Sequence, residues 1–509
     1  MKLSVISAAI SLLLRPSIAE SNLTTPQSTQ QILQGDFKPA QVWENTNLVR
    51  HTNLEKGYVR ENINLVITNT DKVPQLEYYF PFEYDVIGKV GGFEVRDKKD
   101  ETKGKFEVRT AALAAVLDAG VSSKPTQYYT IHLPQALQPK EQITLSITYH
   151  VLSVLAPLPA AIKQDDKQYL VYTSSAYFLS AYPTLKQKLK IKTSSADIPE
   201  YTIPTGLAKP EKQGSTLTYG AYDTPIPPFT THPISIRYEF NKPLLHSTTL
   251  RHDLEVSHWG GNLATEDHYA LTHTGASLIN HFSRVNWAVQ NFHFQSGQSQ
   301  TYAARQLVLP LPAMSADPYY TDDIGNVSTS RFRPTPPFSP TKPAHLELKP
   351  RYPLFGGWNY AFRVGWNSPL SSNLRTLTSQ SNTYILRLPL LSPPSDASGL
   401  SIDAYELNLL LPEGSKILQH HVTGTNLPSF EVEEGTTKTF MDTLGRTRLT
   451  LKGRNVVDEI RDAELFVTYE YTLFSALRKP VTIVLGFVGV FAVVWGVGLI
   501  DNSIGRRKR

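Results

Sequence analysis

Residues 142–151 read QITLSITYHV, and this stretch carries the pattern that decides the fold. Apolar and polar side chains alternate without interruption from Ile143 to Val151. Successive side chains of a β-strand point to opposite faces, so the alternation predicts a strand with one buried face and one face in water.

The same alternation recurs along the chain, at residues 234–240, 405–411 and 465–471. Helical patterns are few, and residues 110–118 are the clearest short candidate. The 36 Pro and 29 Gly residues interrupt most other stretches, as is typical of turns between short strands. We therefore expect a mainly β protein with two β-sandwich-like domains rather than α/β layers.

A domain junction is expected at residues 241–247. One strand pattern ends at Phe240, the turn-forming run Asn241-Lys242-Pro243 follows, and a new strand pattern starts near Thr248. This predicts a first domain at residues 20–240 and a second at residues 247–475.

A weak internal echo raises the hypothesis that these two domains are related. Residues 76–81 recur in outline at residues 307–312, and Asp85–Gly88 recurs as Asp322–Gly325. Two short copies with gaps between them can arise by chance, so both interpretations stay open.

The N-terminus has the layout of a secretory signal peptide. Lys2 precedes a mostly apolar run, and Ser17-Ile18-Ala19 supplies the small residues of a cleavage site. The alternative is a buried N-terminal helix, which would not need that site. We expect residues 1–19 to be a signal peptide and the mature chain to begin at Glu20.

Near the other end, residues 481–500 contain no charged side chain. At about 1.5 Å per residue this stretch covers roughly 30 Å, the thickness of a bilayer core. Basic residues are more numerous after it, at Arg506–Arg509, than before it, at Arg478-Lys479, and positive charge favours the cytosolic side. The pattern predicts a single-pass type I membrane protein with a cytosolic tail of residues 501–509.

Small residues lie along one side of the expected membrane helix. Gly489, Ala492 and Gly496 share a helical face, and Gly486 borders it. Small side chains let a second helix approach closely, so this face is a candidate site for packing against a partner helix. Glycine is also common in membrane helices without such a role.

The chain has 509 residues, no Cys and a formal net charge of +5. The charge belongs to the two ends, because residues 20–500 are formally neutral. This excludes a broad basic surface for nucleic acid. Without cysteine, thiol catalysis and Cys-ligated metals are excluded, and a secreted domain must rely on its core rather than on disulfides.

Two Asn-x-Ser/Thr triplets are glycosylation candidates in a lumenal chain, at Asn326 and at Asn22. Asn22 lies three residues after the proposed cleavage site and is the less secure of the two. Between Pro310 and Pro353, ten prolines predict a long irregular surface segment. Such a segment is either a partner or acceptor-peptide surface or a solvated loop.

No phosphate loop, His-Glu-x-x-His or Gly-x-Ser-x-Gly motif occurs in the sequence. Asp322-Asp323 resembles a paired carboxylate that holds a divalent ion, but such a doublet is more often part of a turn. Seven histidines fall within 48 residues, which raises a metal hypothesis. Their spacing fits metal ligands poorly, and we prefer exposed polar positions of a sheet for His246, His252, His258, His268, His273, His281 and His293.

Several segments, in order along the chain, are similar to the ribophorin I family. They are YFLSAYP at 177–183, EVSHWG at 255–260, YYTDDIGNVSTS at 319–330, YPLFGGW at 352–358, LPEG at 411–414 and FMDTLGR at 440–446. This resemblance covers most of the chain before the membrane helix. It implies two β-rich lumenal domains, which favours the hypothesis of related halves.

The resemblance also implies a function. It points to a non-catalytic subunit of the endoplasmic-reticulum oligosaccharyltransferase, which transfers a preassembled glycan from dolichyl diphosphate to Asn of Asn-x-Ser/Thr in nascent chains. The active site would lie in a separate polytopic subunit, so no catalytic, cofactor or metal residue is expected here. This chain ends soon after the membrane helix, as fungal members do, so no role of a long cytosolic domain carries over. The alternative is a self-sufficient lumenal enzyme with a metal at the histidines or at Asp322-Asp323.

Overall fold

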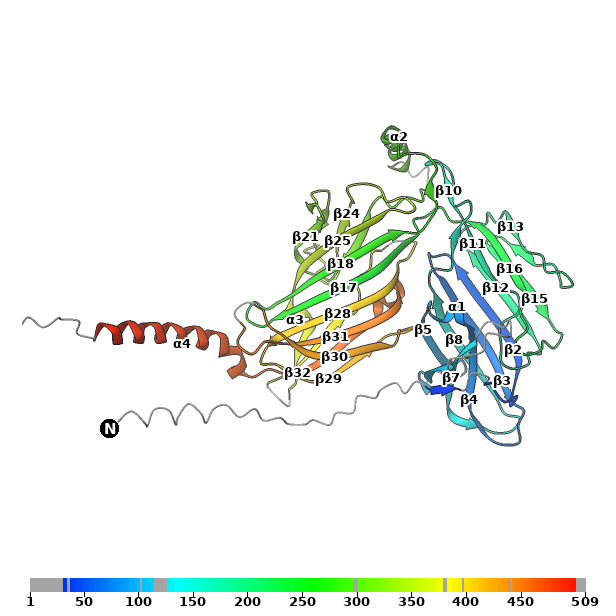
Figure 1. Cartoon of the computed structure of the whole chain (residues 1–509), viewed down its shortest axis with the longest axis horizontal. Coiled ribbons are helices and arrows are strands. Elements are labelled where there is room, and N and C mark those ends of the chain that lie inside the picture. Colours follow the sequence, from blue (N-terminus) through cyan, green and yellow to red (C-terminus); the bar gives the residue numbers. More distant parts are fainter. Residues whose placement is uncertain are drawn as a thin grey trace, which may run out of the picture.

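The computed structural model describes residues 31–33, 37–100, 103–113, 126–295, 301–378, 382–395, 398–439 and 442–499. Strands dominate these residues, and the prediction of a mainly β fold with one C-terminal apolar helix is confirmed (Figure 1). The quoted stretch forms strand β8 (Gln142–Val151), whose inward side chains from Leu145 to Val151 are buried. The other three alternating stretches fall on strands β16, β28 and β32.

The described residues form two large hydrophobic cores. One draws on residues from Trp43 to Leu244 and the other on residues from Leu245 to Tyr471. We call the parts of the chain around them the N-terminal half and the C-terminal half. The exact domain bounds, residues 20–240 and 247–475, stay a prediction, and the expected junction at 241–247 already contains the start of a strand at Leu245.

The described residues of the N-terminal half form three sheets. The large sheet has seven strands in the order β14 (Glu211–Gln213), β15 (Thr216–Tyr222), β12 (Gln187–Thr193), β2 (Trp43–Leu54), β3 (Val59–Asn69), β8 and β5 (Val90–Asp97). A second sheet has the order β13 (Glu200–Tyr201), β16 (Pro233–Glu239), β11 (Tyr169–Ser175) and β9 (Ala156–Pro157). The third has the order β1 (Gln31–Leu33), β6 (Glu107–Leu113), β7 (Thr126–Leu137) and β4 (Gln75–Glu83).

The C-terminal half also contains three sheets. Its large sheet has eight strands in the order β22 (Gly325–Asn326), β21 (Ala316–Asp322), β25 (Asn359–Pro369), β18 (Asn262–His273), β17 (Leu245–Ser257), β28 (Ser401–Glu413), β31 (Arg446–Val457) and β30 (Phe430–Thr437). A second sheet has the order β26 (Leu374–Thr376), β27 (Thr383–Pro389), β32 (Glu464–Glu470) and β29 (Lys416–Thr423). The third has the order β20 (Leu307–Leu311), β24 (Ala344–Leu348) and β23 (Arg331–Arg333). A short parallel pair, β10 (Ala161–Ile162) with β19 (Ser277–Leu278), joins the halves.

The two halves repeat one topology. Each large sheet has a single parallel pair among its described strands, β12 with β2 and β28 with β17. From that pair the sheets continue in the same order and direction, through β3, β8 and β5 in one half and through β18, β25 and β21 in the other. This repetition supports the hypothesis of related halves. The first part of the sequence echo lies on the equivalent strands β4 and β20, whereas the second part lies before β5 in one half and at the end of β21 in the other.

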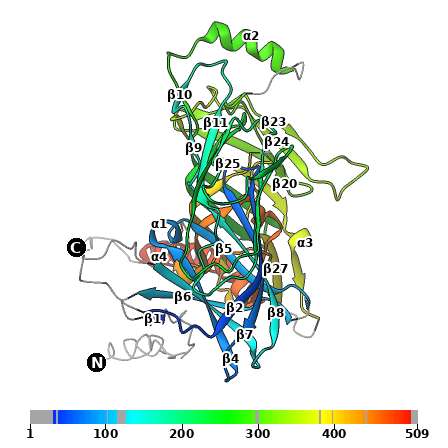
Figure 2. The same cartoon turned by 90° about the vertical axis from the view of Figure 1, so that its right-hand side faces the viewer.

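Helices are few among the described residues: α1 (Tyr84–Ile87), α2 (Arg284–Gln295), α3 (Leu370–Asn373), the 3-10 helix η2 (Asp458–Asp462) and α4 (Leu473–Gly498). The predicted helix at residues 110–118 is wrong where the structure describes it, because residues 107–113 form β6 and pair with β7. Sheet pairing overrides the helix propensity of its alanines. The sequence also missed α2, which projects from the body in Figure 1 and Figure 2. The segment of ten prolines is less irregular than predicted, because it contains β21, β23 and β24.

Helix α4 leaves the C-terminal half and points away from the body (Figure 1). It has 26 residues, and its most apolar window of 18 residues has a mean hydropathy of 2.3 and is not buried. Its length and composition suit a membrane span. It covers the predicted span from residue 481 to Gly498; Ile500 and the tail, like the signal peptide, lie outside the described residues.

Candidate functional site

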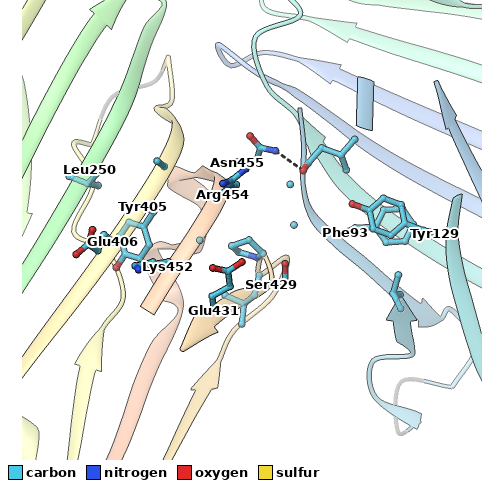
Figure 3. Close-up of a pocket in the computed structure, with 18 of the residues that line it drawn as sticks. Phe93, Tyr129, Leu250, Tyr405, Glu406, Ser429, Glu431, Lys452, Arg454 and Asn455 are labelled. Carbon is cyan, nitrogen blue, oxygen red and sulfur yellow. Dashed lines mark hydrogen bonds between the residues drawn. The ribbon is translucent and has the colours of Figure 1, made fainter. Parts of the chain in front are cut away.

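A cleft of about 730 Å³ lies between the two halves (Figure 3). The N-terminal half contributes residues of β5, β6 and β7, and the C-terminal half contributes residues of β17, β28, β30 and β31. The cleft therefore exists only because segments from both halves meet.

Two sheet edges border the cleft. Strand β5 is the last strand of the seven-stranded sheet and β30 is the last of the eight-stranded sheet. Gly91 and Phe93 of β5 and Glu431 of β30 are among the lining residues. Edge strands expose backbone donors and acceptors that an extended polypeptide can pair with.

The side chains in the cleft combine aromatic surface with both signs of charge. Phe93 and Tyr129 stack with ring centroids 4.6 Å apart and an interplanar angle of 5°. Lys452 forms an ion pair of 2.8 Å with Glu433, and Arg454 is exposed. Figure 3 shows charged side chains of the C-terminal half on one side of the space and the Phe93–Tyr129 stack on the other. Such a lining suits a chemically varied ligand better than one apolar group.

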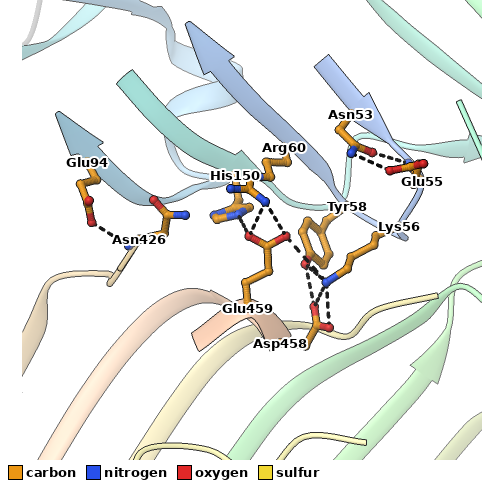
Figure 4. A network of polar contacts seen from close by, with 10 residues as sticks. All are labelled: Asn53, Glu55, Lys56, Tyr58, Arg60, Glu94, His150, Asn426, Asp458 and Glu459. Atoms are coloured by element: carbon orange, nitrogen blue, oxygen red, sulfur yellow. Dashed lines mark hydrogen bonds and ion pairs between the residues drawn. The ribbon is translucent and has the colours of Figure 1, made fainter. Parts of the chain in front are cut away.

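A buried carboxylate ties the halves together beside the cleft (Figure 4). Asp458 of η2 is 5% exposed and accepts a hydrogen bond of 2.6 Å from the hydroxyl of Tyr58. Lys56 Nζ lies 3.0 Å from the other carboxylate oxygen. A carboxylate buried in this way is stable only with such partners, so the contact fixes the relative position of the halves.

The neighbouring Glu459 extends this network. Its carboxylate lies 3.0 Å from His150 Nε2, 3.3 Å from Arg60 Nη1 and 3.7 Å from Lys56 Nζ. Burial alone would raise the pKa of the Glu459 carboxyl, but the contact with His150 and the charges of Arg60 and Lys56 lower it to about 2. Glu459 is therefore ionised near neutral pH and adds attraction between the halves. We call the set Lys56, Tyr58, Arg60, His150, Asp458 and Glu459 the interdomain latch.

Backbone contacts close the interface further. Asn455 donates hydrogen bonds of 2.9 Å to the carbonyls of Gly88 and Val90. Gly91 lies so close that a Cβ there would come within 1.9 Å of the Asn455 carbonyl oxygen. Only glycine fits this approach without moving the two halves apart.

Asn326, the stronger glycosylation candidate, lies in β22 with its side chain exposed. Arg351 donates a hydrogen bond of 3.1 Å to its carbonyl and leaves the side-chain amide accessible. Its modification stays a prediction. Asn22 lies outside the described residues.

The four small residues Gly486, Gly489, Ala492 and Gly496 lie on α4, and all are exposed. Apart from the nearby backbone of α4 itself, no described atom lies within 4 Å of a Cβ built at any of the three glycines. A partner helix can therefore approach this face, and the packing role stays a prediction.

The histidines do not converge. Among the described residues, no group of three metal-ligating side chains occurs. The expectation of exposed sheet positions is wrong for His246, His252 and His273, which are at most 7% exposed. They have separate partners, because His246 contacts Asp403, His252 contacts Asp267 and His273 Nε2 lies 2.7 Å from the Tyr302 carbonyl oxygen. Burial lowers the pKa of His273 to about 4.

Asp322 forms a turn. Its carboxylate accepts hydrogen bonds from the backbone N–H groups of Ile324 and Gly325 at 3.0 and 3.1 Å. The same carboxylate forms an ion pair with Arg351. The hydrogen bond from Arg351 is the main reason that the pKa of Asp322 is lowered. Both carboxylate oxygens are thereby engaged within the protein, and Asp323 is exposed.

Sequence reasoning missed the cleft and the interdomain latch. Their members come from segments up to about 400 residues apart, as in the pair Tyr58 and Asp458. Little in the local sequence marks them, because they come from several strands, from the turn between β2 and β3 and from the 3-10 helix η2. The one local signal was Gly91-Gly92 in a strand pattern, which can mark a close backbone approach.

Comparison with known proteins gives consistent relatives. A family model described as Ribophorin I matches residues 43–498. Proteins named dolichyl-diphosphooligosaccharide–protein glycosyltransferase subunit 1 are 29% identical over 455 residues in Caenorhabditis elegans and 28% identical over 472 residues in Schizosaccharomyces pombe. The alignments cover 88% and 91% of this chain and 74% and 97% of those proteins.

A subunit 1B from rice is 32% identical over 416 residues, which cover 81% of this chain and 82% of the rice protein. Among solved structures, yeast LTA4 hydrolase in complex with bestatin matches with a TM-score of 0.27 at 10% identity, covering 47% of this chain and 35% of that one. A likeness of that size supports no argument. The family match covers nearly all of both halves and the whole of α4, and on this basis the chain belongs to the ribophorin I family.

Proposed function

We propose that this protein is a non-catalytic subunit of the oligosaccharyltransferase complex. That complex transfers a preassembled glycan from dolichyl diphosphate to Asn of Asn-x-Ser/Thr in nascent chains. The observation that carries the proposal is the family match over residues 43–498, since the relatives are named as subunit 1 of this glycosyltransferase. The relatives favour this role over a self-sufficient metal enzyme.

Within the complex, we assign the chemistry to a separate polytopic catalytic subunit and assembly to this chain. The protein would be a single-pass type I protein of the endoplasmic-reticulum membrane, with both halves in the lumen and α4 packed against helices of other subunits. The exposed small residues of α4, from Gly486 to Gly496, support such packing because they allow close helix contact.

The cleft between the halves is the best candidate for contact with nascent polypeptides. Its two edge strands offer backbone pairing, and its mixed charge and aromatic surface tolerate varied sequences. The interdomain latch would hold this surface in a fixed shape. A binder that does not need to recognise one sequence fits the task of presenting many different acceptor sites.

Depletion of the protein in its own cells tests the subunit role. We expect under-occupied Asn-x-Ser/Thr sites in secreted glycoproteins, measured by mass spectrometry of glycopeptides, and restoration by the wild-type chain. Full occupancy together with normal assembly of the complex would remove the proposal.

A charge reversal tests the cleft separately. Arg454→Glu in the cleft should restore assembly but only part of the site occupancy. Lys212→Glu is the matched control, because Lys212 is exposed on β14 at the opposite edge of the seven-stranded sheet. Equal rescue by both variants would exclude a role of the cleft and leave the subunit role standing.

A further inference from the structure

The side chain of Trp259 supplies a hydrogen bond that α4 cannot make by itself. Pro480 lies inside the helix and has no backbone N–H, so the carbonyl of Ala476, four residues earlier, loses its usual donor. The indole Nε1–H of Trp259 donates to that carbonyl at 3.1 Å. The tip of the β17–β18 hairpin is thereby joined to the beginning of the helix.

Other contacts hold the same two turns of α4. Ser475 Oγ donates to the carbonyl of Gly414 at 3.1 Å, and Thr472 caps the helix by accepting from the Ser475 N–H at 3.2 Å. Lys479 forms an ion pair with Asp442, whose carboxylate is fully buried. Burial alone would raise the pKa of Asp442, but Lys479 and Thr439 lower it to about 2. The C-terminal half and the helix are therefore joined at several points, and the depth of one fixes the depth of the other.

The length of α4 defines that depth. Its 26 residues extend about 39 Å, whereas a bilayer core is about 30 Å thick. The uncharged run starts at Val481, so the first eight residues, Leu473 to Pro480, extend about 12 Å beyond the core. The level of Ala476 is then about 7 Å above the core, within the headgroup layer.

Large apolar side chains are exposed at this level and in the first helical turn just above it. Trp259 is 68% exposed, Leu444 is 60% exposed, and Leu473 and Phe474 of the first helical turn are 73% and 77% exposed. Leu444 lies two residues after Asp442 and is held by a 2.6 Å hydrogen bond from its N–H to Glu413. We call Trp259, Leu444, Leu473 and Phe474 the membrane-proximal rim. Three independent segments supply it, so helix sequence alone does not account for it.

We propose that the membrane-proximal rim lies in the headgroup layer of the lumenal leaflet and holds the C-terminal half against the bilayer. The occupant is lipid rather than a protein because the rim is continuous with the membrane helix and mixes aromatic with aliphatic side chains, as in the aromatic belts of membrane proteins. Arg478 lies close to the same level and suits a lipid phosphate, whereas Lys479 is paired with Asp442. This inference rests on the proposed membrane anchoring by α4.

The absence of cysteine makes a direct test possible, since one introduced cysteine carries the only label. The full chain is reconstituted in phosphatidylcholine nanodiscs with an environment-sensitive fluorophore at Leu444→Cys. Val488→Cys in α4 reports on the span, and Val289→Cys reports on water, because Val289 is 57% exposed on α2, far from α4 in Figure 1. Quenching is measured with a headgroup-level nitroxide lipid and with aqueous iodide.

The proposal expects the label at position 444 to be quenched by the nitroxide lipid and protected from iodide, with the reverse at position 289. If position 444 behaves like position 289 while position 488 is quenched by lipid, the rim is in water, the proposal is overturned and the membrane anchor stands. Protection of position 444 from both quenchers means that protein covers it, which also overturns the proposal. A label at position 488 that is not quenched by lipid removes the membrane anchor itself.

Discussion

The two halves share a topology but bury their charges differently. In the N-terminal half, Glu61 of β3 receives two hydrogen bonds from the guanidinium of Arg50 on β2, at 2.7 and 3.0 Å. In the C-terminal half, the equivalent strands β17 and β18 place His252 directly opposite Asp267. All four residues are at most 8% exposed.

The surroundings of these pairs differ as well. Arg50 and Glu61 line a cavity of about 400 Å³, and Ser174, Ser175 and Thr52 complete their hydrogen bonds. The His252–Asp267 pair is sealed in the core, and within the described part of the chain His252 Nε2 and Asp267 Oδ2 have no hydrogen-bond partner. Arginine stays charged and needs a complete set of partners, whereas histidine can be neutral. One topology therefore accommodates an arginine–carboxylate pair near an opening and a histidine–carboxylate pair in a closed core.

The largest expected effect follows from the N-terminal pair. Glu61→Gln leaves the Arg50 charge buried without its counterion, and we expect a loss of about 3–5 kcal/mol in the stability of this half. Asp267→Asn is the matched change in the other half and should cost only about 1–3 kcal/mol, because histidine, unlike arginine, carries no permanent charge. Hydrogen exchange measured by mass spectrometry reports the stability of each half separately. Equal losses in the two halves would contradict the contrast.

The contact between the halves is the next test. Gly91→Ala places a Cβ against the Asn455 carbonyl and should cost about 1–3 kcal/mol while increasing exchange on both sides of the interface. Gly88→Ala is the control, because a Cβ there has no atom within 4 Å. Unchanged exchange in the Gly91 variant would show that the halves do not pack as closely as described.

A pH series tests the interdomain latch. The pKa of Glu459 is lowered from 4.5 to about 2, so its stabilising contribution is complete above pH 4.5 and is lost as the pH falls toward 2. As the pH falls from 4.5 toward 2, hydrogen exchange at the interface should increase in the wild type. The increase should be smaller in Glu459→Gln, which has no carboxyl group to protonate at this position. Glu211→Gln, an exposed position on β14, is the control that should leave the pH response unchanged.

The smallest expected effect concerns the contacts between the C-terminal half and α4. Among the described contacts, the N-terminal half has no such connection to the helix. Trp259→Phe removes one hydrogen bond and should cost about 0.5–1.5 kcal/mol, seen as faster exchange in the first turns of α4. In a Pro480→Ala background the helix regains its own donor, so the same change should cost less. The same cost in both backgrounds would mean that the indole does not replace the missing amide.

Sequence patterns predicted the strands well where alternation was complete, as in β8 and β32, because burial of one face leaves a direct mark on the sequence. They failed at residues 107–113, where pairing with β7 decides the conformation, and at α2, whose pattern is weak. The cleft was not predictable, since lining residues such as Phe93 and Lys452 meet only after both halves have folded.

The sequence by itself determined the strand periodicity, the apolar length of α4 and the resemblance to one family, because these are properties of neighbouring residues. Only the tertiary structure decided which charged side chains are buried together. It also decided that Gly91 packs against the carbonyl of Asn455 and that the indole of Trp259 replaces the backbone donor that Pro480 lacks. The contacts of Gly91 and Trp259 join residues that are hundreds of positions apart, and the buried pairs join neighbouring strands. Their energies depend on burial and on distance in space, which no local pattern encodes.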